Sequence, residues 1–555
     1  MKCLVLVIKF NRAAVYNPQE YHKANYIYPL PFGLAYISAV LKKNGHNVKI
    51  LNLNHCNGTT DEIIKTELSK EFFDFVITGS ISPLFPDVRT CVESVRKYAP
   101  KTRIILGGGL VTSQPEIIFK LLEPDFAVIG EGENTLKELF ECLEKHGDVN
   151  KVDGIVFRNS EGEIIFTNPR SPILDLDSLP YPDFDGFEYE KYFDHMTSNL
   201  CDVFDFPRPY PIIASRSCPF KCTFCFHTLG NKYRQRSVEN IMEEIEYAIK
   251  KYRINIFSFY DDLFSMDKER VNNFCSKLKK IQSTVPWEVK WVCQMRVDNF
   301  DEEMIKIMKY SGCHFVTLGL ESYSPVVLKS MRKGISPQQI DQALRCCTQN
   351  KISISGNFIF GDIAETNETY RETLKYWETN CGSTWSGISL NFIQIYQGSE
   401  IYRHAVKKGI IKDEIEFIEN RAKTNSNHID INFTDNMTDK EYELMKLDVL
   451  CAGLRPKHYI KPLINKQEDG FHEVHVKCPY CMEISIYKNY ILPKNFSISI
   501  ACRKCGGRFL LVSMKEKIKL KIIKTIFRIF GARTIYYPIY YLRKSRTFSI
   551  FFDHS

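Results

Sequence analysis

The sequence predicts an α/β protein in which a doubly wound parallel sheet is followed by an open, partial barrel of six strand–helix units. Three observations lead to this prediction. Apolar strand-like runs alternate with helix-like runs through the first 150 residues, and the alternation resumes from about residue 211 to about residue 405. A β-rich stretch with four cysteines then precedes a basic amphipathic segment. At 555 residues the chain is too long for one core, and we expect boundaries that give the segments 1–150, 151–195, 196–410, 411–470, 471–512 and 513–555.

The first segment contains five strand signals that are separated by helices. The strand signals are CLVLVIKF, VKILNLN, FDFVITGSIS, TRIILGGGL and FAVIGEGE. The helix between the first two strands covers 32–45 and ends on a glycine, which is a common stop. In a doubly wound sheet, ligands bind beyond the carboxyl ends of the strands. The following linker, 151–195, contains a small hairpin, GIVFRNSEGEIIF.

The second alternating region predicts the barrel. Its strand signals are IIASRS, IFSFYDD, VKWVCQM, FVTLGLES, SISGNFIFG and SLNFIQI, with helices between them. Six units favour an open barrel over a closed eight-stranded one. We expect a mainly helical extension over 411–470.

Charge and cysteine content limit the class of protein. Lysine and arginine (74) exceed aspartate and glutamate (66), which gives a formal charge of +8. The stretch from Lys515 to Arg546 has ten basic residues and one acid, so this tail carries the excess and the remaining chain is about neutral. Of the 19 cysteines, seven lie in two tight motifs, a pattern typical of metal sites in a reducing compartment. No secretion signal and no long apolar stretch is evident, so we expect a cytoplasmic location.

Three cysteines gather in the stretch SRSCPFKCTFCFHT, at Cys218, Cys222 and Cys225. A structural zinc site uses four ligands, so three thiolates leave one position open. On a 4Fe–4S cluster, three thiolates hold three irons and expose the fourth. The loop directly follows the first predicted barrel strand, at the end of a barrel where chemistry is expected. The alternative is a zinc knuckle that takes its fourth ligand from elsewhere, such as His227.

The Cys-x3-Cys-x2-Cys spacing, with Phe224 directly before the third cysteine, resembles the radical S-adenosylmethionine superfamily. The resemblance implies that the three cysteines ligate a 4Fe–4S cluster and that S-adenosylmethionine chelates the open iron through its amino and carboxylate groups. It further implies reductive cleavage of S-adenosylmethionine to a 5′-deoxyadenosyl radical. A reductant protein such as flavodoxin or ferredoxin would supply the electron.

Four later motifs follow in the order that this superfamily would have: FYDDLFS, LGLES, GNFIFG and QGSEIY, each at a predicted strand end. The resemblance implies that Asp261 and Asp262 lie near the amino group of S-adenosylmethionine. It also provides candidates for the ribose or carboxylate, namely Arg296, Glu321, Ser322 and Asn357. The alternative for each is hydrogen bonding at a strand end without a ligand.

The first domain resembles the flavodoxin-like, cobalamin-binding domain that is fused to many such enzymes. The resemblance rests on PLPFGLAYISAVLKKNGHNVKILNLN, TGSISPLFPD, LGGGL and VIGEGENTL. It implies cobalamin contacts at Ser80, Ser82, Gly107, Gly108, Gly109, Gly130 and Glu131. One departure is clear: no Asp-x-His-x-x-Gly motif follows the first strand, so cobalamin would bind without a histidine ligand on its lower face. The alternative is a domain of this fold that binds no cofactor.

The C-terminal cysteine pairs, Cys478 with Cys481 and Cys502 with Cys505, have the spacing of a tetrahedral zinc ribbon. A second iron–sulfur cluster is the alternative. In the tail, Lys517, Lys521, Lys524 and Arg528 share one helical stripe, and Ile518, Ile522, Ile526 and Phe530 share another. Such a basic amphipathic helix lies on an anionic membrane surface or docks on its own protein. We therefore expect a cytoplasmic protein with a peripheral membrane contact as an option, and no nucleic-acid partner.

These observations together predict a cobalamin-dependent radical S-adenosylmethionine enzyme. The reaction expected from the resemblance is methylation of an unactivated carbon in a small or lipid-like substrate. Ring formation or rearrangement with the same cofactors is the alternative reaction. A non-catalytic zinc-ribbon protein with a binding or regulatory role is the alternative of another class. No motif identifies the substrate or names a catalytic residue.

Overall fold

The first sheet has the predicted doubly wound topology. This computed structural model describes residues 1–9, 30–195, 202–381, 387–424, 431–454, 459–467, 471–490, 492 and 496–530. Five parallel strands form the sheet, and an antiparallel hairpin extends one edge. The spatial order is β2 (Asn47–Asn52), β1 (Lys2–Val7), β3 (Phe75–Gly79), β4 (Arg103–Gly107), β5 (Phe126–Val128), β6 (Ile155–Arg158) and β7 (Ile164–Phe166). The hairpin that the sequence places in the linker is β6–β7, and it completes this sheet.

Helices cover both faces of this sheet because its strands are apolar on both sides. One face packs against α2 (Phe32–Lys43) and α7 (Gly132–Glu144). The other face packs against α3 (Thr60–Leu68), α4 (Phe85–Tyr98), α5 (Gly108–Ser113) and α6 (Pro115–Leu122).

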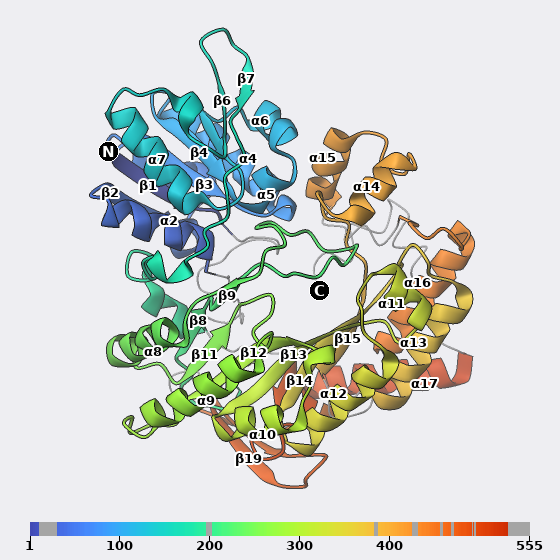
Figure 1. Ribbon diagram of the computed structural model, residues 1–555. Coiled ribbons are helices and arrows are strands. Elements are labelled where there is room, and N and C mark those ends of the chain that lie inside the picture. Colours follow the sequence, from blue (N-terminus) through green and yellow to red (C-terminus); the bar gives the residue numbers. More distant parts are fainter. Residues whose placement is uncertain are drawn as a thin grey trace.

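The second sheet is a six-stranded, all-parallel partial barrel, which confirms the predicted fold class. Its order is β8 (Pro209–Ile212), β11 (Ile256–Phe259), β12 (Lys290–Arg296), β13 (Cys313–Glu321), β14 (Ser353–Phe360) and β15 (Gly387–Phe392). Its helices are α8 (Val238–Tyr252), α9 (Lys268–Gln282), α10 (Glu302–Tyr310), α11 (Pro325–Ser330), α12 (Pro337–Gln349), α13 (Asn367–Asn380) and α14 (Glu400–Lys407). Figure 1 shows the first sheet above the barrel, with a green loop between them.

The first barrel strand differs from the sequence prediction. We expected one strand over IIASRS, but β8 ends at Ile212, and a separate strand β9 (Ser215–Arg216) pairs antiparallel with β10 (Arg234–Gln235). The two short strands form the base of a loop, residues 217–233, which contains the three clustered cysteines. We call it the three-cysteine loop.

Aromatic side chains of the linker connect the two sheets. Phe184 lies 4.6 Å, ring centroid to ring centroid, from Tyr210 on β8 and also packs near Phe32 of α2. The Tyr189 hydroxyl donates to the Pro209 carbonyl oxygen at 2.7 Å. One hydrophobic cluster therefore runs from the first sheet through the linker into the barrel.

The helical extension returns to the first domain. Helix α15 (Glu414–Thr424) contacts α4, where Arg89 and Glu419 form an ion pair at 2.7 Å. Helix α16 (Asp439–Leu454) packs on α13 and β15. β-structure begins again at Tyr459, before the boundary at residue 471 that we expected.

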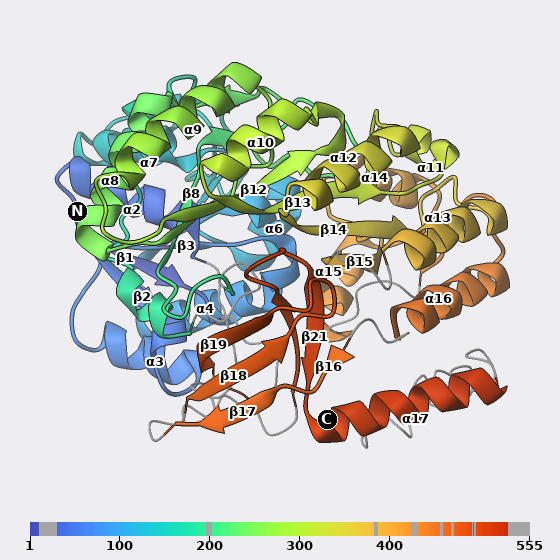
Figure 2. The ribbon, with the colours of Figure 1, turned by 90° about the horizontal axis from the view of Figure 1, so that it is seen from below.

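The C-terminal strands lie beneath the barrel (Figure 2). They are β16 (Tyr459–Ile460), β17 (Leu463–Lys466), β18 (His472–Lys477), β19 (Ile484–Tyr490), β20 (Ser497–Ala501) and β21 (Arg508–Val512), and α17 (Met514–Phe530) follows. Ile518 and Ile522 on α17 are about half exposed. The side chains of Lys524, Ile526, Arg528 and Phe530, and all residues beyond 530, lie outside the described part of the chain. Within the described residues, no helix has the length and apolar character needed to span a membrane.

Candidate functional site

The three-cysteine loop leaves the C-terminal side of the first barrel strand. Ser217 adopts a left-handed φ of 68°, which turns the chain out of β9 directly before Cys218. The amide of Cys225 donates to the Cys222 carbonyl oxygen at 3.1 Å, which closes a tight turn between the second and third cysteine. All three thiols are free of disulfides, and burial raises the pKa of the Cys218 thiol. A bound cation would favour the opposite, deprotonated form.

Segments that follow β13 and β15 contact the loop. The Thr223 amide donates to the Met331 carbonyl oxygen at 3.1 Å, and the Ile401 amide donates to the Thr223 carbonyl oxygen at 3.0 Å. Phe226 packs against Gly398, which follows β15 in the QGSEIY motif. A Cβ at Gly398 would lie 2.5 Å from Phe226 Cδ2, so only glycine allows this approach.

The loop has polar atoms suited to a site. Within the described residues, Thr223 Oγ1 and His227 Nε2 are buried without a hydrogen-bond partner. Buried polar atoms of this kind usually have a partner, which can be a ligand or a bound ion. With three free thiols on the same loop, the donor set fits a 4Fe–4S cluster with one open iron. The alternative from the sequence is zinc with His227 as its fourth ligand.

The two aspartates after β11 have different surroundings. Asp261 is buried and accepts hydrogen bonds from the Ala214 amide at 2.6 Å and the Ser215 hydroxyl at 2.6 Å. Burial raises the pKa of Asp261 to about 6. Asp262 is exposed at the mouth of the barrel. Asp261 therefore braces the start of the loop, whereas Asp262 is open to a ligand.

The other candidates for S-adenosylmethionine come from β12, β13 and β14. Arg296 and Asn357 flank Gly319 in register. The Arg296 guanidinium lies 3.6 Å from the ring centroid of Phe220, within the three-cysteine loop, and its Nε bonds Asp298 at 3.0 Å. Asn357 is exposed, and its side-chain oxygen accepts a hydrogen bond from the side-chain amide of Asn391 at 2.7 Å.

Glu321 ends β13, and Ser322 directly follows it. Glu321 has a left-handed φ of 60° and forms a buried ion pair with Lys333 at 2.7 Å. The missing side chain of Gly319 leaves room for this pair, because a Cβ there would lie 2.6 Å from Lys333 Nζ. The Ser322 hydroxyl lies 3.0 Å from Thr373 Oγ1 and accepts from the Ser324 amide. Direct contact of these six residues with S-adenosylmethionine stays a prediction.

The candidate cobalamin residues lie at the carboxyl ends of β3, β4 and β5. Gly108 has a φ of 82°, and a Cβ there would lie 2.9 Å from the Ser80 carbonyl oxygen. Gly109 lies against Ile81 and against Thr228 of the three-cysteine loop, with 3.7 Å between its Cβ position and Thr228 Oγ1. This edge therefore faces the loop and leaves the backbone accessible, which fits a large ligand.

The remaining members of this set make local contacts. The Ser82 hydroxyl lies 3.2 Å from Ser113 Oγ, and the Gly130 amide donates to Thr112 Oγ1 at 2.9 Å. Both Glu131 carboxylate oxygens are taken: Arg216 donates to one at 2.7 Å and Arg234 to the other at 2.6 Å. Sequence reasoning missed both arginines, although Arg216 lies two residues before Cys218.

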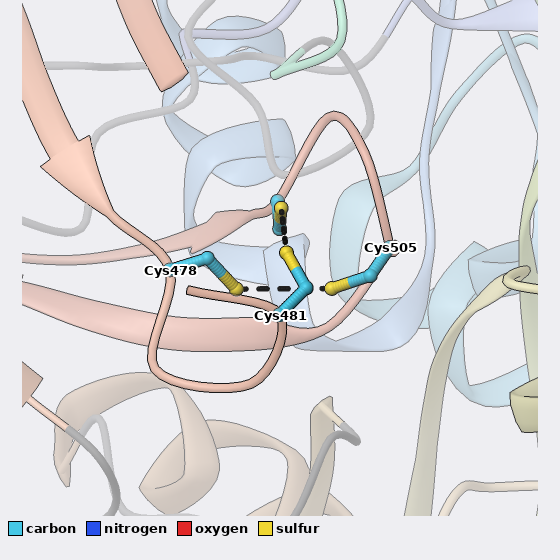
Figure 3. Close-up of side chains that lie close together, drawn as sticks. Cys478, Cys481 and Cys505 are labelled. Carbon is cyan, nitrogen blue, oxygen red and sulfur yellow. Dashed lines mark hydrogen bonds between the residues drawn. The ribbon is translucent and has the colours of Figure 1, made fainter. Parts of the chain in front are cut away.

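The four C-terminal cysteines form a closed metal-ligand set (Figure 3). The sulfur atoms of Cys478, Cys481, Cys502 and Cys505 all lie within 4.8 Å of one another. The Cys478 and Cys505 sulfurs are 3.7 Å apart, as are those of Cys481 and Cys502. Four converging thiols are compatible with zinc, as the spacing predicts, and also with iron.

The ribbon contacts the N-terminal ends of the barrel strands, whereas the three-cysteine loop lies at their C-terminal side. Arg508 of β21 pairs with buried Asp202 at 3.3 Å, and its guanidinium lies 5.6 Å from the ring centroid of Phe315 on β13. A Cβ on Gly506 would lie 2.9 Å from the Lys351 carbonyl oxygen, so the second knuckle contacts the barrel directly.

Comparisons with known proteins agree with both halves of this site. The family model described as the Radical SAM superfamily matches residues 212–376, and the B12 binding domain model matches residues 26–140. An uncharacterized methyltransferase of Pyrococcus horikoshii is 28% identical over 394 residues, covering 69% of this chain and 79% of its own length.

Two further proteins are similar over much of the chain. An anaerobic magnesium-protoporphyrin IX monomethyl ester cyclase of Rubrivivax gelatinosus is 26% identical over 352 residues, which is 62% of this chain and 61% of the cyclase. The solved structure of the radical S-adenosylmethionine methyltransferase TsrM from Kitasatospora setae has a TM-score of 0.58 at 16% identity. It covers 74% of this chain and 77% of TsrM, and at this identity the likeness concerns the fold.

Proposed function

Because this chain belongs to the radical S-adenosylmethionine enzymes with a cobalamin-binding domain, we propose that it transfers a methyl group to an unactivated carbon of a small organic substrate. Its cofactors are a 4Fe–4S cluster, S-adenosylmethionine and cobalamin, and the four-cysteine site of the ribbon is compatible with zinc. When bound, the cluster would supply an electron to S-adenosylmethionine. S-adenosylmethionine would supply the 5′-deoxyadenosyl radical, and cobalamin would supply the methyl group.

The observation that carries the proposal is the position of the three-cysteine loop. It lies between the barrel, where Phe226 contacts Gly398, and the first domain, where Thr228 contacts Gly109. Cys218, Cys222 and Cys225 would hold the cluster. Asp262 and Asn357, which are exposed at the barrel mouth, would orient S-adenosylmethionine. The glycine-rich ends of β3 and β4 would seat cobalamin on the facing side.

Ring formation is the second candidate, and one observation favours it: the Rubrivivax gelatinosus relative is a cyclase. Both reactions would begin at the same barrel mouth. They are distinguished by the product, because only methylation adds the mass of a methylene group to the substrate.

The experiment begins with anaerobic reconstitution of the full chain with iron and sulfide. We expect a 4Fe–4S spectrum by electron paramagnetic resonance after reduction, and release of 5′-deoxyadenosine from S-adenosylmethionine. Cys222→Ala is expected to lose both, whereas the control Cys142→Ala, on helix α7, is expected to retain them. Retained cleavage in Cys222→Ala contradicts the assignment of the loop. Copurification of cobalamin from supplemented cells tests the first domain, and metabolite comparison with a deletion strain identifies the substrate and product.

We also propose two partners, a protein reductant and an anionic membrane surface. The reductant is needed because cleavage of S-adenosylmethionine requires an electron. The membrane contact follows from exposed Ile518 and Ile522 on the basic helix α17. Sedimentation with anionic liposomes tests the second: binding should disappear when residues 515–555 are deleted, and no binding by the full chain rejects it.

A further inference from the structure

Two arginines mark the two ends of the three-cysteine loop. Arg216 lies on β9, two residues before Cys218, and Arg234 lies on β10, directly after the loop. The two residues are register partners in the antiparallel pair. Whatever holds this pair of arginines therefore holds both ends of the loop at once.

The partners of these arginines come from the first domain. Glu131 directly precedes α7, and Glu133 lies in its first turn. Arg216 donates to Glu131 at 2.7 Å and to Glu133 at 2.6 Å, and Arg234 donates to Glu131 at 2.6 Å. We call these four residues the interdomain clamp.

The clamp is buried and its charges balance. Each of its four residues is at most 8% exposed. Glu131 also accepts from the Ile173 amide at 2.8 Å, and Arg234 also donates to the Ile173 carbonyl oxygen and to Ser217 Oγ. Arg216 bridges two carboxylates and Glu131 bridges two guanidinium groups, and removal of one partner leaves another charge buried and unpaired. The clamp therefore favours one relative position of the two domains over all others.

The far part of the loop lies beside the first domain. A Cβ built on Gly109, which follows β4, would lie 3.7 Å from Thr228 Oγ1 and 3.5 Å from Ile81 Cγ2. The loop is thus held at its base by the clamp and lies near its end against the edge at which we place cobalamin. All three cysteines lie between these two contacts.

We propose that the interdomain clamp sets the distance between the three-cysteine loop and the cobalamin edge of the first domain, with Glu131 as its central positioning residue. The inference rests on the proposed function for the identity of the two bound groups, whereas the clamp itself rests on contacts within the chain. It also assigns Glu131 a role different from direct contact with cobalamin, because both its oxygens are engaged.

The test measures position directly. In reconstituted full-length protein, the reduced cluster and cob(II)alamin are both paramagnetic, so pulsed electron paramagnetic resonance reports their separation through spin–spin coupling. The wild type is expected to give one narrow distance distribution. Glu131→Gln is expected to weaken the coupling and broaden the distribution while iron and cobalamin contents stay unchanged. An unchanged distribution in this variant overturns the proposal.

A second measurement needs no cofactor. Amide hydrogen exchange of residues 217–233 in the unreconstituted chain should be about tenfold faster in Glu131→Gln, because the loop loses its anchored base. The matched control is Glu138→Gln, which removes a glutamate on the same helix that pairs with Arg170 at 3.0 Å but lies away from the loop. Equal exchange in the two variants overturns the proposal.

Three further variants keep the proposal testable if Glu131→Gln does not fold. If Glu131→Gln does not fold, Glu133→Gln removes a single contact and should give a smaller change of the same sign; no change there rejects the proposal. Arg234→Lys keeps the charge but loses the planar fork, and should partly restore the distance relative to Arg234→Gln. If the wild type binds no cobalamin, the proposed function fails, but the exchange measurement still decides on the clamp.

Discussion

Gly398→Ala tests how closely the barrel confines the three-cysteine loop. Gly398 has a φ of 86°, and a Cβ there would lie 2.5 Å from Phe226 Cδ2. Ordinary contacts begin at 3.4 Å and Phe226 Cε2 lies nearer still, so the ring must move by at least about 0.9 Å. Phe226 directly follows Cys225, and this movement would displace the third cysteine of the loop.

Two penalties add in this variant. A non-glycine residue at positive φ costs about 1–3 kcal/mol. Overpacking against a confined ring adds about 1–3 kcal/mol. The second penalty acts on the loop, so we expect the iron content after reconstitution and the rate of 5′-deoxyadenosine formation to fall along with stability.

Gly409→Ala is a matched control for the first penalty. Gly409 follows α14 and has a φ of 70°, but nothing lies within 4 Å of its Cβ position. Thermal unfolding and iron analysis of the two variants should therefore differ by the contact with Phe226 alone. If Gly398→Ala matches Gly409→Ala in both stability and iron content, the reasoning that the ring confines the loop is refuted. A double-mutant cycle with Phe226→Ala should show coupling of about 0.5–3 kcal/mol.

Three other predictions concern the ribbon and the barrel. Arg508→Leu leaves the buried Asp202 carboxylate without its cation and should destabilise the fold by about 3–5 kcal/mol, measured by denaturant unfolding; an unchanged midpoint would show that this ion pair does not stabilise the fold. Cys478→Ser should remove one equivalent of bound zinc, measured by elemental analysis, and should leave the reconstituted 4Fe–4S cluster intact. Loss of both metals in this variant would contradict the assignment of two separate sites. Burial raises the pKa of Glu365 to about 7, so the folded state binds a proton that the unfolded state releases near pH 4.5. Stability should then fall by about 3 kcal/mol as pH rises from about 4.5 to about 7, and Glu365→Gln should flatten this slope in unfolding measurements at several pH values.

Much of the fold was predictable because its signals are local. Alternating apolar strands and periodic helices need only neighbouring residues, and the prediction of a doubly wound sheet followed by a six-stranded partial barrel is confirmed. The closed four-cysteine set could also be predicted, because its two Cys-x2-Cys knuckles lie close together in the chain and bring their sulfurs together without distant partners. The resemblance to radical S-adenosylmethionine enzymes with a cobalamin domain is confirmed by the family models that match the chain.

What sequence reasoning missed depends on contacts between distant segments. IIASRS is apolar enough for one strand, but Arg216 pairs with Arg234 across the loop, and this non-local pairing separates β9 from β8. Glu131 and Arg216 are 85 residues apart, and nothing near either residue shows that they meet. The sequence also did not show that Asp261 is buried and accepts hydrogen bonds from the Ala214 amide and the Ser215 hydroxyl. An acid at a strand end does not show by itself whether it faces a ligand or the core.

These non-local contacts explain why the open and the closed cysteine sets lie at opposite ends of one barrel. The ribbon that carries the closed set contacts the N-terminal ends of the barrel strands, where Arg508 pairs with Asp202 and lies near Phe315. The open set lies at the C-terminal mouth, where covering is left to a second domain. In the proposed function this loop leaves one ligand position open, so other contacts have to fix its position. The approach of Phe226 to Gly398 and the interdomain clamp supply such contacts.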